Sequence, residues 1–144
     1  MIHAALLCLA LLADPSVVRD GKRPDLARGW LPTCHQIAVT ASHMGVPADL
    51  AVSTAWHESR LDRNAVGLVG EVGPLQVRPE TWCRATGRVC RDPITAGVRV
   101  LGRYLQRHGE HAVCRYRGAK PGCASERLRR GMAARLSARV RGAS

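Results

Sequence analysis

Apolar residues recur at three- and four-residue intervals along most of this sequence, and that spacing constrains the fold more than any other feature. Such a period places the apolar side chains on one face of a helix. The clearest examples are Cys34, Ile37, Ala38, Ala41 and Met44, and later Ile94, Val98, Leu101 and Leu105. The chain has 144 residues, the length of one domain with a core of its own. We therefore expect a compact, mainly α-helical domain.

Turn-forming residues indicate where these helices begin and end. Gly45 is placed to end the first helix, and Pro47 can lie in the first turn of the next. Asp92, followed by a proline, is typical of a helix start, and Gly109 is placed to end that helix. Residues 62–78 are rich in glycine and turn formers, which predicts a long loop or a small hairpin. Shorter helical segments are expected from Pro79 to Trp82, around Ala112, Val113 and Tyr116, and in residues 124–144.

The first thirteen residues have the profile of a secretory signal. Ala4 to Ala13 form an apolar stretch of the length typical of such a signal, and a polar run follows from Asp14. The alternative is a short N-terminal helix of the protein core. Because no apolar run approaches the roughly 20 residues that span a bilayer, we expect no transmembrane helix. The expected location is the periplasm or the outside of the cell.

Five cysteines would remain after removal of that signal, and two pairs of them enclose short loops. These pairs are Cys83 with Cys90 and Cys114 with Cys123, which leaves Cys34 over. Export permits disulfides, and these local bonds are our preferred pairing among the several that five cysteines allow. A zinc site is the alternative, but its ligand pairs usually lie two to four residues apart, unlike these cysteines. The histidines show no ligand spacing, so we expect no metal and no cofactor.

The chain is strongly basic, with 22 Lys and Arg against 11 Asp and Glu. A formal charge of +11 favours a polyanionic partner such as nucleic acid, acidic lipid or an anionic cell-wall polymer. Residues 124–144 carry six arginines beside an apolar stripe of Leu128, Met132, Leu136 and Val140. One interpretation is a basic module that binds polyanions. We prefer the interpretation that the stripe packs on the domain while the arginines cover the solvent side.

Glu58 is the residue that points most directly to chemistry. It follows Leu50 and Thr54 by eight and four residues, so helical periodicity directs it toward the apolar face. Burial there raises the pKa of a carboxyl group, and a protonated carboxyl is what a general acid requires. The glycine-rich loop that follows can leave an open groove beside it. For an isolated glutamate, the alternative is a solvated side chain or a pair with Arg60 or Arg63.

Glu58 also begins an ordered set of short motifs. They are Glu58-Ser59, Asp62-Arg63-Asn64-Ala65, the run from Gly70 to Thr81, Asp92-Pro93 with Gly97, Leu101 and Leu105, and Arg115-Tyr116-Arg117-Gly118. In this order and at these intervals they resemble the soluble lytic transglycosylase family, over residues 33–120. Two departures are Pro74-Leu75 in place of the usual Leu-Met, and Arg117 in place of the usual Asn.

The resemblance implies a goose-type-lysozyme-like helical fold, with a glycine-rich loop or small hairpin after the catalytic helix. It also implies cleavage of peptidoglycan between N-acetylmuramic acid and N-acetylglucosamine. Glu58 would act as general acid and then as base, leaving a 1,6-anhydromuramyl end without consuming water. The expected organisation is a signal peptide (1–13), an N-terminal extension (14–32), the catalytic domain (33–123) and an arginine-rich C-terminal helix (124–144).

Four further residues are candidates for substrate binding. Gln76 can donate hydrogen bonds to, and accept them from, sugar hydroxyl and N-acetyl groups. Ser59 either positions Glu58 or caps local backbone groups. Tyr116 matches the family tyrosine that hydrogen-bonds the catalytic glutamate, with a core tyrosine as the alternative. Glu71 is the candidate second carboxylate of a hydrolytic muramidase, which would need one about 5–5.5 Å from the first for retention or about 6.5–9.5 Å for inversion.

The expected partners are peptidoglycan glycan strands, with anionic envelope polymers attracted by the overall charge and no specific nucleic acid. We expect a monomer. Wall remodelling, secretion-system assembly and phage entry or release would all use such a domain, and these roles stay open. Trp56 and Trp82 can offer flat faces to sugar rings, but in a chain without Phe we expect them to serve the core.

Overall fold

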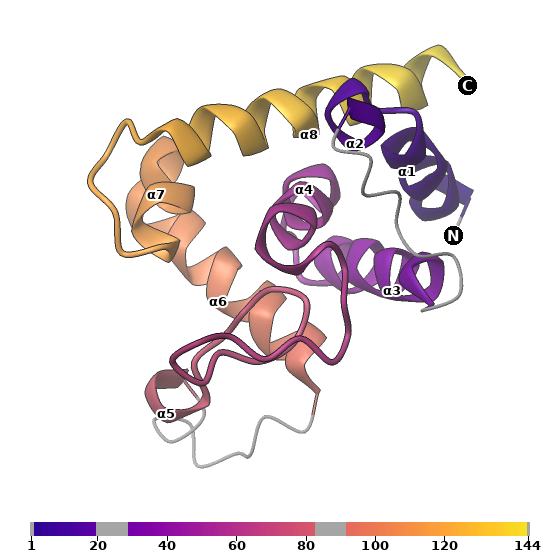
Figure 1. Cartoon of the computed structure of the whole chain (residues 1–144). Helices are drawn as coiled ribbons and strands as arrows, with labels where there is room; N and C mark the ends of the chain where they lie inside the picture. Colours follow the sequence, from indigo (N-terminus) through magenta and orange to yellow (C-terminus); the bar gives the residue numbers. More distant parts are fainter. Residues whose placement is uncertain (1, 20–28, 83–91, 144) are drawn as a thin grey trace.

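The computed structural model describes residues 2–19, 29–82 and 92–143, and these residues are mainly helical (Figure 1). The elements are α1 (Ile2–Leu12), α2 (Pro15–Arg19), α3 (Trp30–His43), α4 (Ala48–Ser59), α5 (Pro79–Trp82), α6 (Pro93–His108), the 3-10 turn η2 (Gly109–His111), α7 (Ala112–Tyr116) and α8 (Ala124–Gly142). The described part of the chain has no strand; two isolated β-bridges join Val66 to Val72 and Val72 to Val77. The expected mainly α domain with one long loop is confirmed.

Helix α4 lies at the centre of the fold, between α3 and α8 (Figure 1). The seven consecutive residues from Leu50 to Trp56 are all buried, so α4 is covered on every side, as expected for a core helix. Helix α8 runs along one side of the molecule and contacts α4, α1 and α7. This burial ends in the last turn of α4, which carries Glu58 and leads into the 60–78 loop.

Helix α6 begins and ends at the residues that the sequence predicts. Asp92 caps α6 by accepting a hydrogen bond from the backbone N–H of Ile94 (3.1 Å), and a proline begins the helix. Gly109 ends α6 with a positive φ of 52°. Helix α4 ends at Ser59, and the two residues that follow it, Arg60 and Leu61, have φ values of 60° and 64°. Such left-handed residues turn the chain sharply out of the helix, although neither is glycine.

A close approach between α6 and the 60–78 loop fixes the loop over the core. Leu75 is fully buried, and its side chain lies against Gly97 of α6. A Cβ atom on Gly97 would lie 2.5 Å from the Cβ atom of Leu75, which is closer than side chains pack. Glycine is therefore needed at this position of α6 for the loop to rest where it does.

Two disulfides lie within the described residues. The Cys114–Cys123 bond is the expected local pair and is confirmed. The expectation that Cys34 is left over is wrong, because Cys34 on α3 bonds to Cys8 on α1. Both of these residues are fully buried where α1 packs on α3, a contact between distant segments that loop length does not reveal. The expected Cys83–Cys90 pair lies outside the described residues.

The segment expected to be a secretory signal forms α1, which packs against α8 and α3. Its buried residues are Ala4, Leu7, Cys8 and Leu11. A chain cleaved after Ala13 would lack both this helix and the Cys8–Cys34 bond. Disulfides are compatible with an exported protein. In the described ranges, none of the helices is long and apolar enough to cross a membrane.

Helix α8 packs on the domain, but its inward face differs from the expected one. Met132, Leu136 and Val140 are buried as predicted, whereas Leu128 is 61% exposed. Arg129 takes the inward position instead and is 1% exposed. An arginine can face inward here because it forms an ion pair with Glu58 of α4. The periodicity of α8 alone does not identify this partner.

A buried ion pair ties the N-terminal segment to α8. Asp14 is fully buried and accepts hydrogen bonds from Arg135 at 2.8 and 3.1 Å and from the backbone N–H of Ser16 at 3.0 Å. Burial by itself raises the pKa of Asp14, but the hydrogen bonds of Arg135 and Ser16 outweigh it and lower the pKa from 3.8 to about 2. The folded chain therefore keeps this carboxylate ionised to lower pH than the unfolded chain does.

Replacing Asp14 with Asn should lower the free energy of unfolding at neutral pH by about 1–2 kcal/mol. A folded-state pKa below the unfolded value stabilises the protein above the unfolded pKa, and that contribution is lost as the pH falls from 3.8 toward about 2. The difference between Asp14→Asn and the wild type should therefore close over this window. Urea unfolding at neutral pH and near pH 2 measures it, with the exposed Glu80→Gln as control. An equal deficit at both pH values would contradict the role of the ion pair.

Two helical glycines should respond in opposite directions to substitution by alanine. Gly97→Ala should destabilise the protein by about 1–3 kcal/mol, because the new methyl group overlaps Leu75. Gly131→Ala in α8 meets only ordinary contact, 3.5 Å from Arg135, so it should stabilise by about 0.5–1 kcal/mol through helix propensity. Chemical denaturation measures both, and a stabilised Gly97→Ala would refute the close loop contact.

Candidate active site

Glu58 lies in the last turn of α4, with its side chain 12% exposed. Its Oε1 atom accepts a hydrogen bond from Nη2 of Arg129 on α8 at 2.9 Å. The same oxygen lies 3.7 Å from Nε of Arg117, which follows α7 and is 47% exposed. The carboxyl group is thus held between a buried guanidinium and a half-exposed one.

Burial raises the pKa of Glu58 above its ordinary value, as its position on the apolar face of α4 predicts. The charges of Arg129 and Arg117 oppose this effect by stabilising the carboxylate, and the negative charge of Glu71 adds to it. Burial has the largest effect, so the protonated form of Glu58 persists to higher pH than in an exposed glutamate. A group of this kind can donate a proton and can then be held as an anion.

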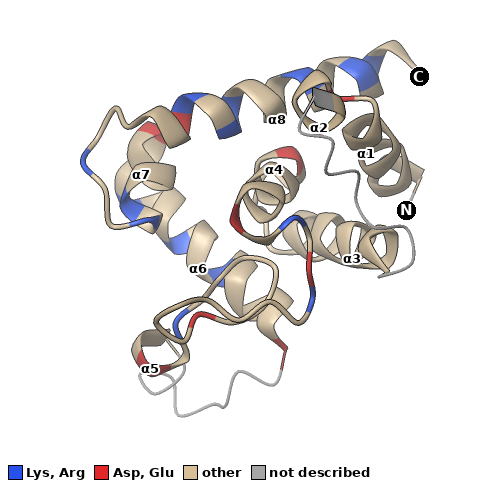
Figure 2. Cartoon of the chain, viewed as in Figure 1, with Lys and Arg blue, Asp and Glu red and all other residues tan. Residues whose placement is uncertain are grey.

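A cavity of about 590 Å³ opens beside Glu58, a size typical of ligand sites. Its walls come from the end of α4, the 60–78 loop, α5, α6, and α7 with the residues after it. Three of the four candidate substrate-binding residues, Glu71, Gln76 and Tyr116, line this cavity with Glu58. Three arginines, at positions 78, 115 and 117, also line it. Figure 2 shows that basic residues are spread over α6, α7 and α8 rather than gathered on α8 alone.

Glu71 is held as an anion at the wall of this cavity. Its Oε2 atom accepts a hydrogen bond from the backbone N–H of Val69 (3.2 Å), and its Oε1 atom lies 3.4 Å from Nη2 of Arg78. Hydrogen bonds from its own backbone N–H, from Val69 and from Arg78 lower the pKa of Glu71. The cavity therefore holds two carboxyl groups whose pKa values are shifted in opposite directions, a pattern typical of paired acid and base groups.

Gln76 reaches the cavity because the loop is turned tightly at that point. Its backbone has a φ of 49°, and its side-chain Nε2 donates to the carbonyl of Gly73 at 2.9 Å. Gly67 makes room for the resulting cluster: a Cβ atom there would lie 2.7 Å from Oε1 of Gln76 and 2.3 Å from Oε2 of Glu71. The amide is therefore held in place by the loop itself.

Ser59 lies beside Glu58 in sequence but is not among the residues that line the cavity. Its Oγ atom donates to the carbonyl of Pro74 at 2.9 Å and lies 3.4 Å from the carbonyl of Ala55. Of its two expected roles, the contacts fit capping of backbone groups. Because Pro74 belongs to the 60–78 loop, this hydrogen bond joins the loop to the end of α4.

Tyr116 lines the cavity from α7, and its hydroxyl donates to the carbonyl of Leu75. A phenol has one proton to donate, so the hydrogen bond to the catalytic glutamate implied by the family resemblance is made by Arg129 instead. Burial raises the pKa of Tyr116, and the nearby charge of Glu58 adds to this effect. Tyr116 thus ties α7 to the 60–78 loop in its neutral form.

Arg129 is a site residue that the sequence pattern does not identify. It contacts Glu58 directly, and its backbone carbonyl accepts a hydrogen bond from Ser53 of α4 at 2.8 Å. Its Nε and Nη1 atoms are buried without a hydrogen-bond partner. The available signal was its spacing, three residues before Met132 and seven before Leu136, which places it on the buried stripe. The general preference of arginine for solvent concealed that signal.

The two tryptophans near the site differ in position. Trp56 is 1% exposed and belongs to the core, as expected. Trp82 lines the cavity and packs edge-on against Tyr104 of α6, with ring centroids 5.7 Å apart. Trp82 is therefore the tryptophan with access to a ligand, although it also packs against the core.

Comparison with known proteins adds no relative: no protein-family model matches the chain, and no curated protein or solved structure matches it significantly.

Removing the buried guanidinium should raise the pKa of Glu58 further. In Arg129→Gln the carboxyl stays buried but loses the charge that most favours its ionised form. The pKa can be measured by NMR titration of carbon-13-labelled glutamate, with Glu58→Gln assigning the resonance. Arg127→Gln, which removes an exposed arginine on the same helix, is the matched control. An unchanged or lower pKa in Arg129→Gln would contradict the pairing of α4 with α8 at this point.

Proposed function

We propose that this protein is a peptidoglycan lytic transglycosylase in which Glu58 is the catalytic acid and then the catalytic base. The observation that carries the proposal is Glu58 itself, a largely buried carboxyl group with a raised pKa at the wall of a cavity. The substrate and the reaction are proposed from the resemblance of the ordered motifs to those of the soluble lytic transglycosylase family. No cofactor is required.

The first step breaks the glycosidic bond. Glu58 donates its proton to the oxygen that links C1 of N-acetylmuramic acid to C4 of N-acetylglucosamine. The bond between C1 and that oxygen breaks, and the N-acetylglucosamine leaves as an alcohol. Positive charge develops at C1, and the ionised Glu71 in the same cavity stabilises it electrostatically.

The second step closes a ring and restores the acid. The C6 hydroxyl of the same muramyl residue bonds to C1 and gives its proton to the Glu58 carboxylate. The product carries a 1,6-anhydromuramyl end, and the reaction consumes no water. Between the steps, the guanidinium groups of Arg129 and Arg117 hold the carboxylate that the first step leaves. Arg117, in place of the family Asn, thus has a role of its own.

The fold arrangement supports the same proposal. A buried central helix ends at the proposed acid, and a glycine-containing loop follows directly and lines the cavity. This is the order that a goose-type-lysozyme-like domain implies, and we assign the chain that architecture. We further propose that the protein is exported and acts on glycan strands as a monomer.

A hydrolytic muramidase is the second candidate, and one observation favours it. Glu58 and Glu71 line the same cavity, with pKa values shifted in opposite directions. In that reaction Glu71 would act as the nucleophile or activate a water molecule, and the product would carry a reducing muramyl end. The hydrogen bond from Val69 and the ion pair with Arg78 engage both oxygens of Glu71, which makes the transglycosylase the better fit.

The non-catalytic alternative, a basic protein that binds polyanions, is weakened by how the arginines of α8 are used. Five of its arginines contact other groups of the protein. Arg127, Arg129, Arg130, Arg135 and Arg139 contact Gly122, Glu58, Glu126, Asp14 and Ala10, respectively. Much of this charge therefore stabilises the fold, although its field still attracts anionic envelope polymers.

The proposal predicts a sharp difference between the two carboxylates. Glu58→Gln should lower the rate of glycan release from purified peptidoglycan by at least about 100-fold, since it removes the general acid. Glu71→Gln should lower the rate less than Glu58→Gln does, because Glu71 stabilises charge but transfers no proton. Mass spectrometry of the soluble products measures both, and binding of insoluble peptidoglycan by Glu58→Gln should be retained.

The outcomes separate the three functions. Loss of activity in both variants, with reducing ends from the wild type, would indicate the muramidase. No soluble product from any variant, with binding of polyanions unchanged in Glu58→Gln, would indicate the basic binding protein.

A further inference from the structure

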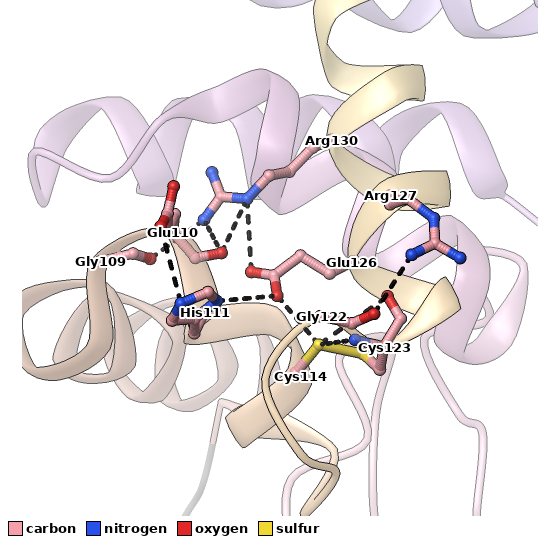
Figure 3. Close-up of polar contacts among 9 residues, drawn as sticks. All are labelled: Gly109, Glu110, His111, Cys114, Gly122, Cys123, Glu126, Arg127 and Arg130. Carbon is pink, nitrogen blue, oxygen red and sulfur yellow. Dashed lines mark hydrogen bonds and ion pairs between the residues drawn. A yellow bond between two sulfur atoms is a disulfide. The ribbon is translucent and has the colours of Figure 1, made fainter.

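A second polar cluster lies where α7 meets the start of α8 (Figure 3). It contains the Cys114–Cys123 disulfide, the carboxyl group of Glu126 and the imidazole of His111. Oε2 of Glu126 lies 2.9 Å from Sγ of Cys114 and 3.8 Å from Nδ1 of His111. The two sulfur atoms and a carboxylate oxygen of Glu126 all lie within 4.8 Å of one another. None of these residues lines the candidate active-site cavity.

The disulfide alone does not account for the position of Glu126. This side chain is 7% exposed, and burying a carboxylate is costly unless both oxygens are engaged. Arg130 engages Oε1 at 3.4 Å. Oε2 instead faces a disulfide sulfur, which has no proton to donate, and lies 3.8 Å from Nδ1 of His111, too far for a hydrogen bond. A thiol, or a cation bound between the sulfur and the imidazole, would engage that oxygen.

The four side chains have the spacing and the chemistry of a zinc site. Two residues separate His111 from Cys114, and two separate Cys123 from Glu126, as in many structural zinc sites. Two thiolates, one imidazole nitrogen and one carboxylate oxygen form a four-coordinate set that zinc accepts. The spacing of the cysteines alone does not reveal this pattern, because each closely spaced pair combines one cysteine with a histidine or a glutamate.

The groups around the cluster are those that orient metal ligands. Nε2 of His111 lies 3.6 Å from Oε1 of Glu110, so a carboxylate faces the ring nitrogen opposite the cluster. Arg130 holds the far oxygen of Glu126. The backbone N–H of Cys123 donates to Sγ of Cys114 at 3.0 Å, a contact that favours a thiolate. His111 is 46% exposed, which gives an ion a path of entry.

We propose that reduction of the Cys114–Cys123 bond converts this cluster into a zinc site with His111, Cys114, Cys123 and Glu126 as ligands. A dithiol reductant supplies two electrons and two protons: its own sulfurs form a disulfide, and the two cysteines become thiols. Zinc then binds the thiolates and releases their two protons. The sulfurs move apart to about 3.8 Å, as tetrahedral geometry with Zn–S bonds of about 2.3 Å requires.

The disulfide and the zinc ion are thus alternative cross-links of one loop. Residues 114–123 include Tyr116 and Arg117, which contact Leu75 and Glu58. Either cross-link closes this loop and keeps both side chains at the cavity. In a reducing compartment zinc holds the loop, and in an oxidising one the disulfide does.

Zinc binding by the full chain tests this inference without reference to catalysis. Protein reduced with a phosphine and dialysed first against zinc and then against metal-free buffer should retain tightly bound zinc, and oxidised protein should retain none at this site. Cobalt in place of zinc should give a sulfur-to-cobalt charge-transfer band and intense tetrahedral d–d bands. The double variant Cys83→Ser/Cys90→Ser, which removes one other pair of thiols, should behave like the wild type.

Ligand variants give the decisive comparison. Glu110→Gln should weaken zinc binding by about 10–100-fold, because Glu110 contacts the His111 ring that would bind the ion. His111→Gln and Glu126→Gln, which remove ligands, should weaken zinc binding by at least as much. His43→Gln, at an exposed histidine of α3, is the matched control and should change nothing. Circular dichroism verifies that each reduced variant stays helical. If the reduced wild type retains no zinc, or if His111→Gln and Glu126→Gln bind zinc as the wild type does, the inference is overturned.

Discussion

The ion pair between Glu58 and Arg129 is the interaction on which the site depends. It joins the last turn of the central helix to the helix that closes the fold, across 71 positions of sequence. Removing both charges from water is costly, and a buried pair of this kind contributes little net stability by itself. The ion pair matters because it places the guanidinium group of α8 beside a carboxyl group whose pKa is raised by burial. The carboxyl group therefore keeps its proton to higher pH than an exposed glutamate does, and the guanidinium stabilises it when it ionises.

The remaining walls of the cavity are fixed by contacts that converge on one short stretch of the 60–78 loop. Ser59 binds the carbonyl of Pro74, Tyr116 binds the carbonyl of Leu75, and Gly97 lets Leu75 rest on α6. These contacts come from α4, α7 and α6. Three helices thus hold a segment that has almost no regular structure of its own, and such support makes a loop precise enough to carry a binding site.

Much of this could be predicted from the sequence, because much of it is local. The period of the apolar residues gives the helices, and Asp92 and Gly109 mark the ends of α6 for reasons contained in a few residues. The position of Glu58 on the apolar face of α4 gives the direction of its pKa shift. The short loop between Cys114 and Cys123 gives that disulfide.

What could not be predicted depends on contacts between distant segments. Cys8 finds Cys34 only because α1 packs on α3. Arg129 can face inward because it forms an ion pair with the buried Glu58. Without such a partner, an arginine is expected at the solvent-exposed surface. The same applies to Tyr116, whose proton goes to the loop instead of to Glu58. The pattern of a single sequence predicts which face of a helix is buried. It does not predict which residue of another helix that face contacts.

In the proposed reaction, Glu58 transfers a proton to the glycosidic oxygen and then takes one from the C6 hydroxyl, with no water consumed. Digestion of purified peptidoglycan in water enriched in heavy oxygen tests it most directly, with product masses read by mass spectrometry. We expect anhydromuramyl products from the wild type that carry no heavy oxygen at the new end, and at least about 100-fold slower product formation by Glu58→Gln. Products with one heavy oxygen at a reducing muramyl end, or cleavage by Glu58→Gln at the wild-type rate, would contradict this mechanism.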